Sequence, residues 1–316
     1  MHLNNPETKK SFTYKWYNNN VDNYQTFNQI PDFFINDTSY LTEIQSNFYN
    51  EVKFPNYDNI DNFSTLIEKA SRSLFAKKLD EEIPFGSKIL EVGCGTGQLS
   101  IFLSRFGRKV FAIDISRGSL IEGKKFIDKC GIKNVYFSRM NLFKSFFPKN
   151  YFDFVISNGV LHHTHSAKLA FQNIIKLLKP QGYVLIGLYH KQGRFLHSIR
   201  QKIIKKFGKN FIFLDSFFKK NISEEKKKAW FFDQYKNPSE TSHSVSEVIS
   251  WFKESDIDYI SSVLFDFESN VNLLKKRNKS SKYLLMIKEQ IQLFNLKNLK
   301  EGGFFIVIGK KNSASI

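Results

Sequence analysis

The feature that most constrains this fold is a regular alternation of short apolar runs with amphipathic stretches between residues 88 and 189. The apolar runs predict strands at Lys88–Val92, Val110–Ile113, Val135–Met140, Phe152–Ser157 and Tyr183–Tyr189. Helices are predicted between them, near Gln98–Phe106, Ser119–Cys130 and Ser166–Leu178. Strands that alternate with helices at this spacing form a parallel sheet with helices on both faces. The pattern therefore predicts an α/β fold.

Regular patterns also flank this region. An amphipathic helix is predicted over Ser64–Leu79, with Ser64 as its N-cap. Ser244 and Glu247 form a capping-box pattern at the start of a later helix. The remaining predicted elements are a strand near Tyr259–Phe265, a helical region around Lys282–Phe294 and a β-rich segment over Phe304–Gly309. We expect an extension or cap over residues 1–63, a core over 64–189, an insertion over 190–243 and a C-terminal completion of the sheet over 244–316.

Composition is typical of a globular protein. The chain has 316 residues, 41% hydrophobic and 24% charged, which is enough for a full core. Its two cysteines, Cys94 and Cys130, lie in segments of different character, as expected of free thiols in a reducing compartment. No apolar run approaches the roughly 20 residues of a membrane-spanning helix. We expect a cytoplasmic protein without a membrane span, and the sequence carries no signal for an oligomeric state.

The net charge of +17 is unevenly distributed. Residues 190–229 carry twelve Lys and Arg against Asp215, Glu224 and Glu225, interleaved with phenylalanines. Such a block could form a lid, attract an acidic substrate, or contact RNA or anionic lipid. The alternative is an amphipathic cover whose Phe side chains pack on the core while its Lys side chains are solvated. With 39 Lys and only 8 Arg in the chain, a nucleic-acid partner is not favoured.

Three glycines stand where the first strand of the alternating region leads into a helix. The loop reads Gly93-Cys94-Gly95-Thr96-Gly97, which allows a sharp turn and a close approach to a ligand. It lacks the third glycine of a dinucleotide fingerprint, because position 98 is Gln, and no Gly-Lys-Ser/Thr follows. Asp114 lies 21 residues after Gly93, where a carboxylate can accept both ribose hydroxyls. Together these features predict a nucleoside cofactor that carries no phosphate.

These motifs resemble the class I S-adenosylmethionine-dependent methyltransferases, whose first motif is E/D-x-G-x-G-x-G and here begins at Glu91. Residues 152–163 and 177–182 are similar to that family's fourth-strand motif and to the turn before its fifth strand. The resemblance implies a Rossmann-like, mostly parallel sheet of seven strands with the last strand antiparallel. It implies S-adenosyl-L-methionine as cofactor and S-adenosyl-L-homocysteine as product. Looser likenesses point to a bacterial branch of small methyltransferases whose acceptors are mostly unassigned.

The resemblance also implies a set of cofactor-binding residues: Glu91, Gly93, Cys94, Gly95, Thr96, Gly97, Asp114, Ile115, Asn141, Leu142 and Asn158. On the family pattern Glu91 and the glycine loop hold the methionine portion, and Asp114 holds the ribose. Asn141 and Leu142 meet the adenine, and Asn158 borders the methyl group. Asn141 departs from the Asp that the family usually has, although its amide oxygen can still accept a hydrogen bond from the adenine amino group.

Catalytic and substrate-contacting candidates follow the predicted strands. A base is needed only where the acceptor must lose a proton, and His162, His163 and His165 follow the fourth strand, at the edge where ligands bind. We take His163 first and His162 second; alternatively, His163 only orients the loop. Candidate substrate contacts are Tyr14, Trp16, Tyr189, His190 and Tyr235, with Asp233 and His243 as further candidates. Tyr14 and Trp16 alternate with Phe12, so they could equally belong to an extended packing tether.

The sequence thus predicts an S-adenosylmethionine-dependent methyltransferase that acts on an O, N or C nucleophile of a small molecule. The alternatives are an RNA methyltransferase that uses the basic insertion, and a catalytically silent cofactor-binding module that serves a partner. Ser157-Asn158-Gly159-Val160 differs from the Asn/Asp-Pro-Pro-aromatic motif used on exocyclic adenine or glutamine nitrogens, and no Pro-Cys nucleophile is present. No spaced Cys/His set indicates a structural zinc, so we expect no metal.

Overall fold

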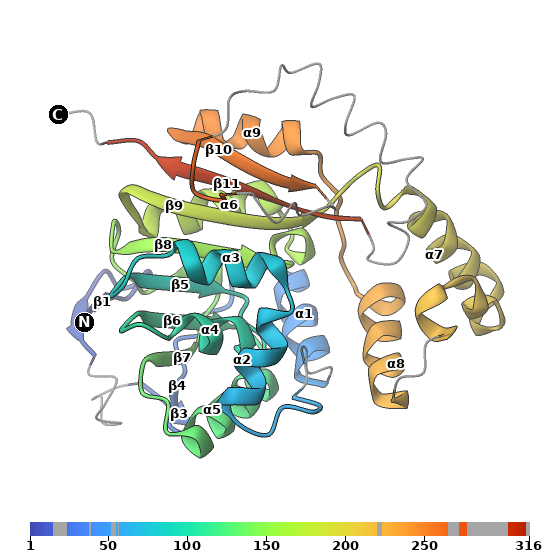
Figure 1. Cartoon of the computed structure of the whole chain (residues 1–316), viewed down its shortest axis with the longest axis horizontal. Helices are drawn as coiled ribbons and strands as arrows, with labels where there is room; N and C mark the ends of the chain where they lie inside the picture. The colour runs from blue at the N-terminus through green and yellow to red at the C-terminus, as the bar shows by residue number, and fades with distance from the viewer. Residues whose placement is uncertain are drawn as a thin grey trace.

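The computed structural model describes residues 1–14, 24–37, 39–51, 55, 57–219, 223–264, 272–276 and 303–313. Among these residues, seven strands form one sheet in the order β10-β11-β9-β8-β5-β6-β7 (Figure 1). The strands are β5 (Lys88–Val92), β6 (Lys109–Asp114), β7 (Val135–Arg139), β8 (Phe152–Asn158), β9 (Leu178–Tyr189), β10 (Ile257–Leu264) and β11 (Phe304–Lys311). The five strands predicted between residues 88 and 189 are therefore present.

The direction of the strands confirms the predicted fold class. Strands β5 to β9 pair in parallel with their neighbours. The last strand of the chain, β11, lies between β9 and β10 and is antiparallel to both. A Rossmann-like, mostly parallel sheet with an antiparallel last strand is the result.

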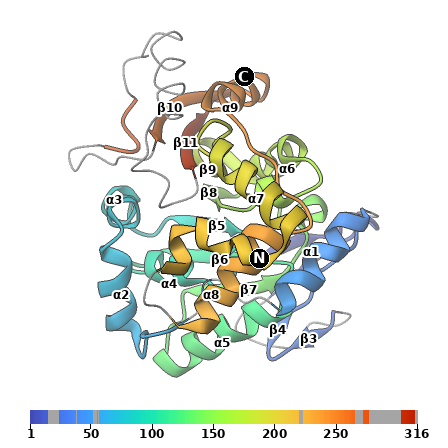
Figure 2. The same cartoon turned by 90° about the vertical axis from the view of Figure 1, so that its right-hand side faces the viewer.

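Helices cover both faces of the sheet, and its strands are therefore buried on both sides. Along β6, Val110 and Ala112 pack with the helices of one face, whereas Phe111 and Ile113 pack with those of the other. The first face carries α2 (Phe63–Ser71), α3 (Leu74–Glu82), α4 (Gln98–Leu103) and α5 (Arg117–Cys130). The second face carries α6 (Ala167–Ile174) and α9 (Val245–Glu254) (Figure 2).

The amino-terminal segment packs on the second face through aromatic side chains. It contains two short hairpins, β1 (His2–Asn4) with β2 (Ser11–Thr13) and β3 (Thr26–Phe27) with β4 (Ile30–Pro31), and then α1 (Tyr40–Glu51). The Tyr14 ring is 2% exposed and meets Phe33 edge-on, with their centroids 5.3 Å apart. Phe12 stacks on Tyr24 at 4.6 Å. The described part of this segment therefore serves as a packing tether.

The helix predicted over Ser64–Leu79 is two helices, α2 and α3. Asn62, not Ser64, is the N-cap of α2, because its side chain accepts a hydrogen bond from the backbone of Thr65, whose hydroxyl accepts one in return. Helix α2 ends at its C-cap, Arg72, and Ser73 is the N-cap of α3. Apolar spacing identified the buried face of this segment, but the polar capping groups decide where each helix begins.

The described residues 195–219 and 223–236 form the helical insertion after β9. Its elements are α7 (Phe195–Phe207), η4 (Lys209–Leu214), η5 (Ser216–Lys219), α8 (Glu224–Phe231) and the π-helix η6 (Phe232–Lys236). Helices α7 and α8 lie beyond the carboxyl ends of the parallel strands, in front of the sheet when it is viewed from that side (Figure 2). Short 3₁₀ helices η1 (Leu142–Lys144), η2 (Leu161–His163) and η3 (Ile175–Leu177) complete the core.

The carboxy-terminal predictions are met in part. Ser244 accepts a hydrogen bond from the Glu247 backbone at 3.1 Å and caps α9 as predicted. The predicted strand over Tyr259–Phe265 corresponds to β10, with Phe265 outside the described residues, and the segment Lys282–Phe294 also lies outside them. None of the described helices is both long and apolar enough to cross a bilayer.

Candidate active site

A cavity of about 550 Å³ lies at the carboxyl edge of the sheet. The ends of β5, β6, β8 and β9 contribute lining residues, and α1 and the helical insertion close the cavity from outside the sheet. Open parallel sheets bind ligands at this edge. We call the part beside the glycine loop the cofactor half and the part beside η2 and η6 the acceptor half.

The glycine loop adopts a backbone conformation that residues other than glycine rarely take. Gly93 has φ +71°, and a Cβ atom there would lie 2.3 Å from Cγ2 of Val160. Gly97 has φ +78°, and its Cβ would lie 2.4 Å from Cζ of Phe137. A side chain at either position is therefore excluded twice, by backbone conformation and by space.

The segment before α2 fixes the loop from outside. The Thr96 hydroxyl donates a hydrogen bond to the Pro55 carbonyl at 2.6 Å, and the Tyr57 hydroxyl donates to the Thr96 carbonyl at 2.7 Å. Tyr57 in turn stacks on Phe126 of α5, with centroids 4.5 Å apart. These contacts place the polar groups of Thr96 toward the protein rather than toward the cavity.

Asp114 ends β6 beside the glycine loop. One carboxylate oxygen accepts the Gly95 backbone N–H at 2.8 Å, and the other accepts the Ser116 backbone N–H at 2.8 Å. Burial raises the pKa of Asp114, and these backbone hydrogen bonds oppose the rise because they favour the ionised form. Each oxygen can still accept another hydrogen bond. The carboxylate thus holds the loop in place and lines the cavity as an acceptor.

Glu91 lies at the floor of the cofactor half. Its side chain accepts a hydrogen bond from the Ser100 hydroxyl of α4. Burial raises the pKa of Glu91 to about 7, with the nearby Asp114 charge as a smaller contribution. A carboxyl group with this pKa changes charge near neutrality and responds strongly to a cation beside it.

Asn141 follows β7 and is almost fully buried. Its amide oxygen accepts the Phe143 backbone N–H at 3.0 Å, which caps η1, and its amide nitrogen donates to the Ile35 carbonyl at 3.0 Å. The side chain is therefore fixed by the protein at both ends. The amide oxygen keeps one lone pair toward the cavity that it lines.

His163 lines the acceptor half, and its environment sets its tautomer. Its Nδ1 atom lies 3.0 Å from the Ser239 carbonyl oxygen. Because a carbonyl oxygen only accepts hydrogen bonds, Nδ1 carries the proton and the neutral ring has its lone pair on Nε2. The ring meets Tyr49 and Tyr189 edge-on, with centroids 6.3 and 5.8 Å away.

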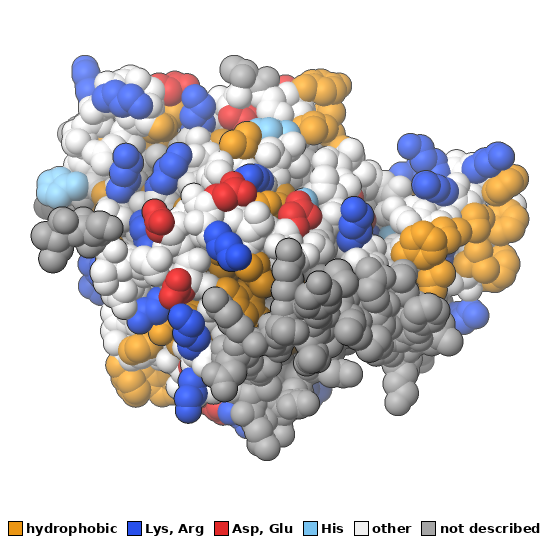
Figure 3. All heavy atoms as spheres, turned by 90° about the horizontal axis from the view of Figure 1, so that it is seen from above, with side chains coloured by type: hydrophobic (Ala, Val, Ile, Leu, Met, Phe, Trp, Pro, Cys, Tyr) orange, Lys and Arg blue, Asp and Glu red, His pale blue; other side chains and the backbone are white. Residues whose placement is uncertain are grey.

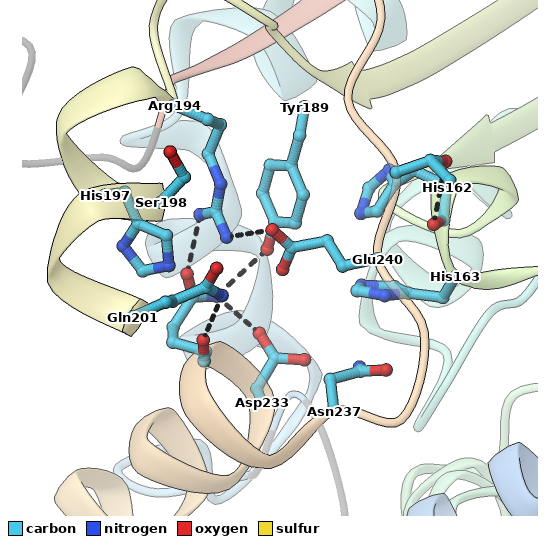
Figure 4. A network of polar contacts seen from close by, with 12 residues as sticks. His162, His163, Tyr189, Arg194, His197, Ser198, Gln201, Asp233, Asn237 and Glu240 are labelled. Carbon is cyan, nitrogen blue, oxygen red and sulfur yellow. Dashed lines mark hydrogen bonds and ion pairs between the residues drawn. The ribbon is translucent and has the colours of Figure 1, made fainter. Parts of the chain in front are cut away.

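A polar network connects β9 with the insertion across the acceptor half (Figure 4). The Arg194 guanidinium lies 3.8 Å from the Tyr189 ring centroid. It donates to Glu240 at 2.5 Å and to the Gln234 side-chain oxygen at 2.7 Å. The Gln234 amide donates to the Tyr189 hydroxyl at 2.9 Å and to Asp233 at 2.6 Å. The network fixes the positions of Tyr189 and Asp233.

Asp233 has a second neutral donor on the opposite side. The Tyr49 hydroxyl of α1 lies 3.3 Å from its other oxygen and accepts a hydrogen bond from Asn237 at 2.9 Å. Burial and the Asp233 charge raise the pKa of Tyr49 well above 10, so its hydroxyl stays protonated. Asp233 forms no ion pair with any residue that the structure describes, although it lines the cavity. It stands on the π-helix η6, a rare element that is frequent at functional sites.

Comparisons with known proteins find similarity over the part of the chain that carries the glycine loop. Residues 90–186 match the family described as "Methyltransferase domain". The "Ubiquinone/menaquinone biosynthesis C-methyltransferase UbiE" of Stutzerimonas stutzeri is 36% identical over 119 residues, 36% of this chain and 46% of that protein. The "Ubiquinone biosynthesis O-methyltransferase" of Bradyrhizobium diazoefficiens is 27% identical over 106 residues, 34% and 41% of the two chains. Residues 90–186 are therefore similar to the methyltransferase domain of S-adenosylmethionine-dependent methyltransferases.

Solved structures agree with the fold of this chain. "PKMT2 from Rickettsia typhi" superimposes with a TM-score of 0.52 at 14% identity, over 78% of this chain and 53% of that chain. The "Phospholethanolamine N-methyltransferase 2" of Haemonchus contortus, solved with phosphomonomethylethanolamine and S-adenosylhomocysteine, has a TM-score of 0.50 at 16% identity, over 90% and 62%. The chain spans less than half the length of the two curated relatives above.

The cofactor of this methyltransferase family is S-adenosylmethionine, and the residues present fit it. The cofactor half offers carboxylate acceptors and open glycine backbone among apolar side chains such as Ile115 and Leu142. Among the described residues, Arg194 is the one Lys or Arg that lines the cavity, and it lies in the acceptor half with Glu240 as partner. A cofactor half without cations suits a nucleoside that carries no phosphate.

Nine of the eleven cofactor residues predicted from the sequence line the cavity, namely Glu91, Gly93, Cys94, Gly95, Asp114, Ile115, Asn141, Leu142 and Asn158. Thr96 and Gly97 do not line it. Thr96 is bound to Pro55 and Tyr57, and Gly97 packs against Phe137, so both shape the loop from behind. Motif spacing identifies the loop, but it cannot tell which of its residues face the ligand.

The structure gives the two adjacent histidines different positions. His163 lines the cavity, whereas His162 is fully buried beneath it and does not. The His162 ring packs 4.1 Å from the Tyr189 ring and 4.2 Å from that of His163, and neither of its nitrogens has a hydrogen-bond partner among the described residues. Burial lowers its pKa well below 6.5, so the ring is neutral. This placement is that of a core residue.

Of the predicted substrate contacts, Tyr189 lines the cavity and Tyr14, His190 and Tyr235 do not. Tyr14 is in the core with Phe33. His190 follows Tyr189 directly, so alternation along the strand turns it to the opposite side, edge-on to Phe305. The Tyr235 hydroxyl donates to Asp215 at 2.8 Å within the insertion. Trp16 lies outside the described residues. His165 and Asp233 line the cavity, and His243 does not.

Several residues that line the cavity were not predicted from the sequence. Leu41, Gln45 and Tyr49 are spaced by four and project from one face of α1, a signal that the sequence does contain. The Gln45 amide donates to Asn237 at 2.8 Å, which attaches α1 to the insertion. Arg194, Trp230, Gln234 and Phe304 also line the cavity, and no local pattern marks them because tertiary packing brings them together.

Proposed function

We propose that the chain transfers a methyl group from S-adenosylmethionine to an O, N or C nucleophile of a small molecule. One observation carries this proposal: a single cavity joins the glycine loop and Asp114 at one end to His163, Tyr189 and Asp233 at the other. A site that only bound the cofactor would not need the second half. Fixed groups on two sides of one cavity support transfer, because placement and exclusion of water supply most of the catalysis in such a displacement.

We propose that Asp114 accepts hydrogen bonds from the ribose, that Glu91 and the glycine loop hold the methionine portion, and that Asn141 and Leu142 border the adenine. Bound at this place, S-adenosylmethionine supplies a methyl group on a sulfonium, which is already a good leaving group. The protein therefore has no leaving group to activate. Its remaining chemical task is to orient the acceptor and to take up the proton that the acceptor releases.

His163 is the proposed base. Its Nδ1–H is held by the Ser239 carbonyl, which leaves Nε2 as a fixed proton acceptor in the acceptor half. A proton taken up at Nε2 makes the ring a cation, which the Ser239 carbonyl and the nearby Asp233 carboxylate would both stabilise. Tyr49, with its pKa raised, remains a donor and does not compete for that proton.

The acceptor half suits a small molecule with a flat apolar body and one polar donor. Aromatic side chains line it, namely Tyr49, Tyr189, Trp230 and Phe304. Asp233 already accepts from two neutral donors and has no cation beside it among the described residues, so an O–H or N–H of the acceptor completes its hydrogen bonding. The curated relatives carry names from ubiquinone and menaquinone biosynthesis, which favours a ring acceptor of that kind.

The contribution of Asp233 can be measured. We expect Asp233→Asn to raise the KM for the acceptor about tenfold, because the carboxylate is replaced by a weaker, neutral hydrogen-bond acceptor. The affinity for S-adenosylhomocysteine should stay within twofold of wild type. The readout is the initial rate of methyl-label transfer at several dilutions of a cell metabolite extract. An unchanged concentration dependence would remove Asp233 from the acceptor site.

Cofactor affinity should depend on pH through Glu91. With a pKa of about 7, the carboxyl is mostly neutral at pH 6 and ionised at pH 8. The cationic ammonium of the methionine portion prefers the ionised form, so binding must expel a proton below pH 7. We therefore expect the affinity for S-adenosylhomocysteine to fall about tenfold from pH 8 to pH 6. Titration calorimetry at pH 6, 7 and 8 measures this.

Glu91→Gln is the control for this pH dependence. The variant cannot ionise, so its affinity should be nearly independent of pH and lower than that of the wild type at pH 8. Calorimetry in buffers of different ionisation enthalpy should also show proton release from the wild type alone. A wild-type affinity that stays flat from pH 6 to pH 8 would contradict a cation at Glu91.

A combined experiment separates the proposed function from a silent binding module. The protein is first titrated with S-adenosylhomocysteine, and then incubated with methyl-labelled S-adenosylmethionine and a cell metabolite extract. We expect binding in the micromolar range and label in a small molecule. Binding without label transfer would instead indicate a silent module. Label recovered in RNA, in the same assay with total RNA added, would indicate an RNA methyltransferase.

A further inference from the structure

Exposed apolar side chains are concentrated on one short stretch of the insertion. Of the ten large apolar side chains that are exposed in the described residues, six lie between residues 195 and 214. They are Phe195, Leu196, Ile199, Phe207, Phe213 and Leu214, and their exposed fractions run from 41% to 56%. We call these six residues the α7 face. The interpretation of the insertion as a cover whose phenylalanines pack on the core does not hold for Phe195, Phe207 and Phe213.

The helix that carries the α7 face is anchored by its opposite side. His197 and Ile204 of α7 are buried, at 3% and 6% exposure. Phe195, Ile199, Ile203 and Phe207 are spaced by four, which places them in one row on the outer side of the helix. The row continues into η4, where Phe211 contacts Phe207 and Phe213, with ring centroids 5.6 and 6.2 Å apart. The surface is therefore continuous and faces outward.

Lysines border this apolar surface. Lys202, Lys205 and Lys206 are exposed, and none forms an ion pair with a described residue. Figure 3 shows hydrophobic side chains together with Lys and Arg side chains at the end of the molecule that carries the insertion. Residues 190–229 hold twelve basic residues against three acidic ones, and one of the three, Asp215, is buried beside Arg200. The border of the α7 face is thus strongly positive.

We propose that the α7 face docks this protein on an anionic lipid bilayer. An amphipathic helix with Phe, Leu and Ile on one side and Lys beside them lies in the plane of a bilayer surface, with its apolar side chains below the headgroups. The basic border adds attraction to anionic lipids. Lipid is the favoured occupant because the α7 face combines an apolar row with lysines that form no ion pair with a described residue, and a charged bilayer surface complements both features.

Two other occupants fit the same surface less well. A second copy of the chain would bring two strongly basic regions together across a two-fold axis, and like charges at an interface oppose association. Single-stranded RNA binds through stacking of its bases on aromatic rings, but Leu196, Ile199 and Leu214 are aliphatic and offer no ring. Both occupants are distinguished in the experiment below.

The position of the α7 face connects docking to the cavity. Arg194 immediately precedes α7 as its N-cap and lines the acceptor half, where it holds Gln234 and Glu240. The docked helix would therefore begin beside the cavity. An apolar acceptor that is dissolved in the bilayer would reach this side of the molecule without crossing bulk water.

Vesicle flotation tests the docking surface. The full chain is mixed with vesicles of phosphatidylcholine alone, or of phosphatidylcholine with one quarter phosphatidylglycerol, at low salt. We expect flotation with the anionic vesicles and little with the neutral ones, and a marked loss in 0.5 M salt. The variant F195S/I199S/F207S should lower the bound fraction at least about tenfold, because it removes the inserted apolar groups. K202E/K205E/K206E should do the same by reversing the charge.

The matched control is F85S/L169S, which removes two exposed apolar side chains from elsewhere on the surface, 77% and 51% exposed. It should float like the wild type. All variants should retain their affinity for S-adenosylhomocysteine, which shows that they are folded. No flotation with anionic vesicles at low salt overturns the proposal, as does flotation that F195S/I199S/F207S leaves unchanged. A dimer that this variant dissociates, or tRNA bound in preference to vesicles, would assign the face to another occupant.

Discussion

Asp114→Ala should weaken binding of S-adenosylhomocysteine about 100-fold or more. The variant removes a carboxylate that we place on the ribose, and a hydrogen bond to a charged group contributes about 1.5–3 kcal/mol. It also removes the acceptor of two backbone N–H groups at 2.8 Å each, that of Gly95 in the glycine loop and that of Ser116 after β6. Asp114→Asn keeps the size and one acceptor oxygen, so its loss should be smaller, about tenfold. Calorimetric titration measures both variants.

Asp153→Ala is the matched control for Asp114→Ala. Asp153 does not line the cavity. Like Asp114, it accepts a backbone N–H, that of Lys88, at 2.8 Å, and it also accepts a hydrogen bond from Lys179 at 2.6 Å. It is the second residue of β8 and therefore lies at the opposite end of the strand from the carboxyl edge that holds the cavity. We expect Asp153→Ala to lower thermal stability without changing cofactor affinity. Equal loss of affinity in both variants would mean that Asp114 acts only through folding.

His163→Ala should lower kcat for methyl transfer about 100-fold or more, the usual contribution of a positioned general base. The affinity for S-adenosylhomocysteine should not change by more than twofold, because the ring lies in the acceptor half. The readout is the initial rate of label transfer into the acceptor found in metabolite extract. Added imidazole should restore part of the rate, since it can take up the proton from the space that the side chain leaves. An acceptor that needs no deprotonation would show neither effect.

His162→Ala separates chemistry from packing. This ring is buried beside His163 and Tyr189 and does not line the cavity described above, so its removal should lower the free energy of unfolding by about 2–3 kcal/mol. The kcat for methyl transfer should stay close to that of the wild type at a temperature where the variant is folded. If His162→Ala lost kcat as strongly as His163→Ala, the pair rather than Nε2 of His163 would carry the role.

The sequence predicted the sheet because its signals are local. Each predicted strand between residues 88 and 189 is a short apolar run. A helix between two such strands returns the chain to the same end of the sheet, so the strands pair in parallel. The cofactor half followed for the same reason. The glycine loop and Asp114 stand at the ends of consecutive strands β5 and β6, which pair in parallel, so their carboxyl ends meet at one edge. Where polar caps decide a boundary, as at Asn62 and Ser73, apolar spacing alone misplaced the helix ends.

The acceptor half was decided by tertiary structure. Tyr49, Tyr189 and Asp233 are far apart in sequence and meet only because α1 and the insertion fold over the same edge of the sheet. His162 and His163 are indistinguishable as neighbours in a motif; both are buried, but only His163 lines the cavity. The α7 face is a further example, because composition alone leaves the direction of its phenylalanines open. Local sequence thus determined the strands, the loop and its carboxylate, whereas long-range packing, which no local pattern encodes, determined which side chains share the cavity and which face outward.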